Sequence, residues 1–84
     1  MFRYDIKLVT KRNGIIVGKT KINNTKIMTK TEICYDFENE PYYVTVVYKF
    51  YKGRYIGVRC EYDDNSIESG VRYTIDKAIM YNEI

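Results

Sequence analysis

The sequence predicts an α+β protein, in which an antiparallel β-meander of about five strands carries a C-terminal helix packed on the sheet. One observation is composition: ten tyrosines and many Val, Ile and Thr residues stand beside a single Leu and a single Ala among 84 residues. Such residues lose rotamer freedom in a helix and suit a pleated sheet. The other observation is period-two alternation of apolar and polar residues, which recurs in five segments between residues 2 and 62.

The first two strands are predicted to form a hairpin. Apolar residues at every second position from Phe2 to Leu8 indicate a strand with one buried face. Asn13-Gly14 tolerates the positive φ angles of a type I′ turn. We therefore expect a second strand, over residues 15–22, to fold back antiparallel on the first.

Three further strands follow, separated by turn-forming residues. After a loop at residues 23–25, alternation from Ile27 to Phe37 predicts the third strand. Pro41 marks the entry of the fourth strand, which is predicted to be central because one of its faces is buried and the other is amphipathic. A tight turn at Lys52-Gly53 leads to the fifth strand, over residues 55–62, in which alternation places Tyr55 and Arg59 on one face.

The C-terminal segment allows two interpretations. Apolar residues at helical spacing over 67–79, preceded by a capping residue in Asp64-Asn65, predict one helix lying across the sheet. Gly70 inside that helix and the alternation of residues 71–75 favour the alternative, a nearly all-β protein with a sixth strand and a short helix over 76–82. We expect the single helix.

Length and composition predict one soluble domain over residues 1–84. The hydrophobic content of 45% and charged content of 30% are typical of a globular chain. No run approaches the ~20 apolar residues that a membrane helix needs, so a cytoplasmic protein without membrane contact is expected. Residue types with AT-rich codons make up half the chain, which fits a phage or mobile element and, for a viral gene, the host cytoplasm. Cys34 and Cys60 are expected to be free thiols.

The chain lacks the residues that most enzymes use. Without histidine, Ser-His, Cys-His and zinc-hydrolase sites cannot be built. The acidic cluster from Glu61 to Glu68 does not match an EF-hand loop, and Gly14 and Gly18 do not match a phosphate-binding loop. We therefore expect no enzymatic activity, no cofactor and no metal site.

Positive charge is concentrated in the N-terminal part of the chain. Residues 1–31 carry eight basic residues and one acid, whereas the remainder carries six basic and ten acidic residues. In the predicted hairpin, Lys19 and Lys21 project from the same side of the second strand, and Lys11 and Arg12 flank the turn. Such a ribbon suits a nucleic-acid groove or an acidic protein surface, although lysines on an edge hairpin also prevent aggregation.

Tyrosines form a second candidate surface. Tyr43 and Tyr51 share one face of the fourth strand, and Tyr55 follows across the turn, among basic residues. Such rings either anchor protein interfaces or stack on the bases of single strands, and cross-strand packing within the sheet also accounts for many of them. The candidate binding residues are therefore Lys11, Arg12, Lys19, Lys21, Tyr43, Lys49, Tyr51, Lys52, Arg54, Tyr55 and Arg59.

These features favour binding over catalysis. The first hypothesis is a small non-enzymatic protein-binding module, encoded by a phage or mobile element, that inhibits a host nucleic-acid-processing or defence complex. The alternative is a nucleic-acid-binding β-sheet protein that uses the basic N-terminal hairpin and the tyrosine-rich face. An exposed sheet edge also gives a route to a homodimer.

Overall fold

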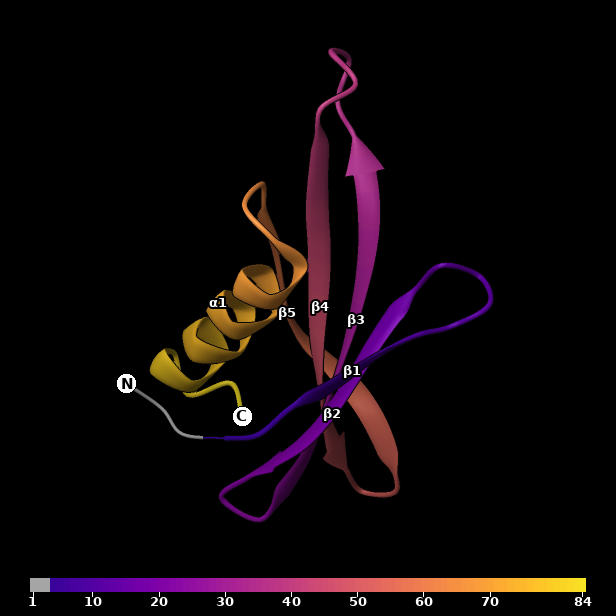
Figure 1. Cartoon of the computed structure of the whole chain (residues 1–84). Helices are drawn as coiled ribbons and strands as arrows, with labels where there is room; N and C mark the ends of the chain where they lie inside the picture. The colour runs from indigo at the N-terminus through magenta and orange to yellow at the C-terminus, as the bar shows by residue number, and fades with distance from the viewer. Residues whose placement is uncertain (1–3) are drawn as a thin grey trace.

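The computed structural model describes residues 4–84 as a five-stranded antiparallel sheet followed by one helix (Figure 1). The strands lie in chain order, which confirms the predicted α+β meander with a C-terminal helix. The fourth strand, predicted to be central, lies inside the sheet between the third and fifth strands, and the third strand is the middle one of the five. Phe2, in the predicted first strand, lies outside the described residues. The elements are β1 (Lys7–Thr10), β2 (Ile16–Ile22), β3 (Thr25–Tyr35), β4 (Pro41–Tyr51), β5 (Arg54–Asp63) and α1 (Ile67–Met80).

The β1–β2 connection forms a hairpin, but not through the predicted type I′ turn. Of Asn13 and Gly14, only Gly14 has a positive φ, of 87°. The Gly14 amide donates to the Lys11 carbonyl oxygen over 2.9 Å, and the Lys11 amide donates to the Ile15 carbonyl oxygen over 2.8 Å. This pattern indicates a three-residue loop that ends in a left-handed glycine.

Two later turns have the geometry that was expected for the first. Asn23 and Asn24, between β2 and β3, have φ angles of 50° and 64°. Lys52 and Gly53, between β4 and β5, have φ angles of 49° and 86°. Two consecutive positive φ angles are typical of type I′ hairpin turns, which match the twist of paired strands. The tight turn predicted at Lys52-Gly53 is confirmed.

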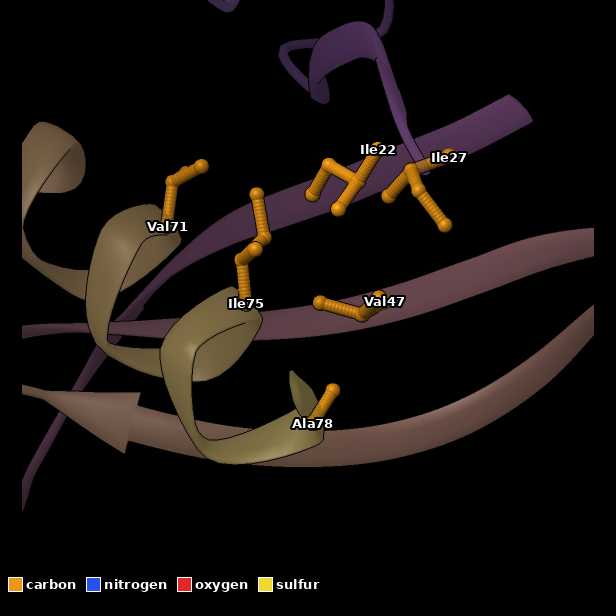
Figure 2. Close-up of a cluster of buried hydrophobic side chains, with 6 residues drawn as sticks. All are labelled: Ile22, Ile27, Val47, Val71, Ile75 and Ala78. Carbon is orange, nitrogen blue, oxygen red and sulfur yellow. The ribbon is translucent and has the colours of Figure 1, made fainter. Parts of the chain in front are cut away.

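The hydrophobic core lies between α1 and one face of the sheet. Figure 2 shows helix side chains directed at side chains of the sheet across this interface. Every fully buried side chain of the strands belongs to this covered face. The core cluster contains Ile22, Ile27, Val47, Val71, Ile75 and Ala78.

The start of α1 explains why the single helix forms. Ser66, and not Asp64 or Asn65, is the N-cap, and its side chain accepts a hydrogen bond from the Ser69 amide over 3.0 Å. A Cβ at Gly70 would lie 3.2 Å from the Cβ of Asp63, so the absent side chain lets the helix approach β5 closely. The alternative with a sixth strand is therefore wrong.

A β-bulge reverses the alternation of β5. Val47 pairs with Arg59 while its neighbour Tyr48 pairs with Gly57, which leaves Val58 as an extra residue. Odd-numbered residues before Val58 therefore lie on one face of the sheet, and odd-numbered residues after it lie on the other face.

Candidate binding surface on the open sheet face

The face of the sheet opposite α1 has no buried side chain among the described strand residues. We call it the open face (Figure 1). Alternation places two groups of side chains there, one on β1 to β3 and the other on β4 and β5. The lysine patch consists of Lys7, Lys19, Lys21, Lys26 and Lys30, and the aromatic patch of Tyr42, Tyr48, Phe50, Tyr55 and Tyr62.

The lysine patch contains like charges placed directly opposite one another. Lys7 pairs with Lys19 across β1 and β2, and Lys21 pairs with Lys26 across β2 and β3. Cross-strand pairs of like charge destabilise a sheet. Glu32 is the one acidic residue at an open-face position of the five strands, and no lysine of the patch takes part in an ion pair within residues 4–84.

Protection of a sheet edge does not account for these lysines. Lys26 and Lys30 belong to β3, which has two strands on either side of it, and Lys19 and Lys21 belong to the interior strand β2. Edge protection requires charges on the outermost strands. Within the lysine patch, only Lys7 lies on such a strand.

The aromatic patch lies directly beside the lysine patch. The Lys26 Nζ atom lies 5.4 Å from the ring centroid of Phe50, and the Lys30 Nζ atom lies 5.4 Å from that of Tyr48. The ring of Tyr55 meets Phe50 edge-on, with 5.1 Å between centroids. These contacts place cations and ring faces next to each other along the boundary between β3 and β4.

The predicted binding residues do not form one surface. Lys19, Lys21 and Tyr55 lie on the open face; Tyr43, Lys49 and Arg59 lie on the covered face; Tyr51, Lys52 and Arg54 lie at the β4–β5 turn; Lys11 and Arg12 lie at the β1–β2 turn. The predicted grouping of the fifth-strand residues Tyr55 and Arg59 on one face is wrong, because the bulge at Val58 separates them.

Tyr43 shares its face with the buried Thr45, so the fourth-strand face that was predicted to bind is largely the one that α1 covers. Sequence reasoning missed Lys7, Lys26, Lys30, Tyr48 and Phe50 as a common surface. The available signal was the alternation of Lys26 and Lys30 with Ile27 and Thr29 on the third strand.

Arg59 holds the C-terminal segment to the sheet. Its guanidinium bonds to the carboxylates of Glu61 and Glu83, and it lies 4.9 Å from the ring centroid of Tyr81. The hydrogen bonds from Arg59 hold the pKa of Glu83 below its usual value. Arg59 is therefore a structural residue whose donors are already engaged.

The acidic residues near the N-terminal end of β4 stabilise local structure. An open hollow there is bordered by Asp36, Glu40, Asp63 and Asp64. Asp36 accepts hydrogen bonds from the amides of its own loop, and Asp63 accepts one from the Ser69 hydroxyl over 2.6 Å. Within residues 4–84, no group of side chains has an arrangement that could hold a metal ion.

Comparison of the chain with protein-family models, curated proteins and solved structures finds no match. In the part of the chain that the structure describes, no helix has both the length and the apolar character needed to cross a membrane.

Cys34 and Cys60 are free thiols, as expected; they lie on β3 and β5, with β4 between them. The evidence that bears on function therefore comes from the open face.

Proposed function

We propose that this protein is a small non-enzymatic binding module that docks an anionic partner on the open face. One observation carries the proposal: the lysine patch contains two directly opposed lysine pairs on a face with a single acidic residue. Such pairs cost the free protein stability, whereas a bound anion relieves their repulsion. The expected partner is an acidic protein surface or a nucleic acid.

The uncovered aromatic patch supports the same proposal. On the open face, Phe50 of β4 is 38% exposed and Tyr62 of β5 is 74% exposed. Aromatic side chains supply large contact areas with little loss of conformational entropy, which makes them effective anchors in interfaces. An apolar strip beside a row of cations can thus hold a partner through contact area as well as through charge.

The proposal is tested by charge reversal on the open face. A Lys19→Glu, Lys21→Glu, Lys26→Glu variant and the unaltered protein are used as baits for affinity capture from a lysate of the source organism or, for a viral gene, of its host. The matched control reverses the same number of charges elsewhere, at Lys11, Arg12 and Lys77. Nuclease treatment of half of each sample separates protein partners from nucleic acid.

The open-face variant is expected to lose the captured partner, and the control is expected to keep it. Loss of folding does not explain such a result, because Lys19→Glu turns the repulsive pair with Lys7 into an attractive one, worth about 0.2–1 kcal/mol, while positions 21 and 26 remain a pair of like charge. Identical capture by the two variants contradicts the proposal.

A further inference from the structure

We propose that the ligand of the open face is a single strand of nucleic acid, with its phosphates on the lysine patch and its bases stacked on the aromatic patch. This inference rests on the proposed function, since it names the partner of the same face. It is carried by three features: the spacing of the rings, the position of the lysines beside them, and the absence of arginine from the open-face positions of the five described strands.

The rings have the arrangement of a stacking platform. Tyr48 and Phe50 are two residues apart on β4, so their side chains rise from the same face about 6.8 Å apart. Tyr55 adds a third ring from β5, edge-on to Phe50. Bases stack on such rings without regard to sequence, because every base presents a π-face.

Each of the first two rings has its own lysine on the neighbouring strand. Lys26 lies over Phe50 and Lys30 lies over Tyr48, both at 5.4 Å from the ring centroid. A contact between an exposed ammonium group and a ring is weak. A phosphate on β3 can therefore draw the ammonium group away and leave the ring face free for the attached base, which lies toward β4.

A second row of cations lies farther from the rings. Lys21 is directly opposite Lys26, and Lys19 is directly opposite Met28 on β3. Four lysines on two adjacent strands thus border the same side of the aromatic patch. A phosphodiester backbone that follows β3 meets cations on its outer side and rings on its inner side.

The kind of cation favours phosphate over an acidic protein surface. No open-face position of the five strands is an arginine. Protein interfaces are enriched in arginine and depleted in lysine relative to the rest of the protein surface. Lysine acts as a flexible point charge, which suits a regularly charged backbone.

Other occupants fit less well. A second copy of the chain would place one lysine patch against another with only Glu32 to offset it. The major groove of a duplex admits a two-stranded ribbon, whereas the open face spans five strands. Bases that are stacked inside a duplex are also out of reach of Tyr48 and Phe50.

The test is fluorescence anisotropy with labelled oligonucleotides of about 10 nucleotides, within the range bound by small sheet domains. Single-stranded DNA, single-stranded RNA and the corresponding DNA duplex are titrated at about 50 and 200 mM salt. We expect both single strands to bind more tightly than the duplex. Four phosphate contacts predict a slope of about −2.8 against log salt, so affinity should fall roughly 50-fold over that range.

Variants separate stacking from charge. Phe50→Ala and Tyr48→Ala should each weaken single-strand binding roughly 5- to 150-fold and leave the salt slope unchanged. Lys26→Gln and Lys30→Gln should each reduce the slope by about 0.7. Lys77→Gln, on α1, is the matched control and should change neither quantity. Circular dichroism of each variant confirms that the sheet is intact.

The possible outcomes show whether the ligand assignment fails or the proposed docking surface fails. Absence of binding at low salt, or preference for the duplex, overturns the single-strand assignment. If open-face charge reversal still removes a captured protein in the experiment above, the proposed function stands with a protein partner. If oligonucleotides bind and neither the ring nor the lysine variants change the affinity, the nucleic acid binds elsewhere and the assignment of a single strand to the open face is overturned, while the capture experiment decides the proposed function.

Discussion

Replacing Thr29 with valine is expected to stabilise the protein, although Thr29 lies in the middle of the sheet. Thr29 is fully buried on the covered face of β3, and its hydroxyl oxygen has no hydrogen-bond partner among residues 4–84. A buried hydroxyl without a partner costs about 1–3 kcal/mol in proteins. Valine has nearly the same shape and no polar atom, so Thr29→Val should raise the free energy of unfolding by about 1 kcal/mol after allowance for imperfect fit.

Thr31 provides a matched control two residues along the same strand. Its hydroxyl shares a hydrogen bond of 2.9 Å with the hydroxyl of Thr45, and both residues are fully buried. Thr31→Val leaves the Thr45 hydroxyl alone and should cost about 1–3 kcal/mol. The double variant Thr31→Val, Thr45→Val removes both groups and should lie close to the unaltered protein.

The measurement is urea unfolding followed by far-ultraviolet circular dichroism, since the chain has no tryptophan. In a thermal experiment, 1 kcal/mol corresponds to a shift of about 4–8 °C for a domain of this size. The reasoning is refuted if Thr29→Val destabilises the protein as much as Thr31→Val does. That result would mean that the Thr29 hydroxyl makes a favourable interaction in the folded protein.

Three further predictions concern the ends of the chain and the start of the helix. Burial, with a contribution from a nearby aspartate, raises the pKa of Tyr4 to about 12, so the folded state keeps a proton that the unfolded chain loses above pH 10. Stability should therefore fall between pH 10 and 12, and less steeply in Tyr4→Phe, as measured by urea unfolding. Arg59→Gln should increase hydrogen exchange of residues 81–84 at neutral pH, and acid should do the same in the unaltered protein as pH falls through the lowered pKa of Glu83. Ser66→Ala should cost about 1 kcal/mol in unfolding free energy and Ser66→Asp almost nothing, because aspartate also caps helices.

Local rules were sufficient to predict most of the architecture. Alternation located all five strands, and helical spacing located α1, because both follow from which side chains must be buried together. The turn types were less predictable. Asn13-Gly14 has the sequence of a type I′ turn, but the pairing of Thr10 with Ile16 leaves too many residues between the strands for that turn.

The candidate site was less predictable than the fold, because alternation defines two faces but does not say which one the helix covers. On the fourth strand, Val44, Val46 and Tyr48 read as a core face in sequence, whereas Thr45 lies with Tyr43 on the face that was predicted to bind. The structure has the opposite arrangement, with Thr45 buried and Val44 and Val46 half-buried. Hydrophobicity alone is misleading in this case, since threonine packs well on a sheet and Thr45 has a hydrogen-bond partner.

The bulge at Val58 added a second source of error. A single extra residue exchanges the faces of everything beyond it, so Tyr55 and Arg59 separate although their spacing in sequence is even. The two residues therefore have different roles. Tyr55 joins Phe50 on the open face, whereas Arg59 is bound by carboxylates on the covered face.

The core and the proposed binding surface occupy opposite faces of one sheet because the chain is small. With one helix, the protein can cover a single face, and it does so over β3, β4 and β5. The open face then keeps its apolar strip in water and its opposed lysine pairs unrelieved, both of which reduce stability. Changes as small as Lys21→Glu would remove part of that cost. These costs arise partly on two interior strands, where edge protection has no use, and the partner that we propose would offset them by supplying negative charge and covering the exposed rings.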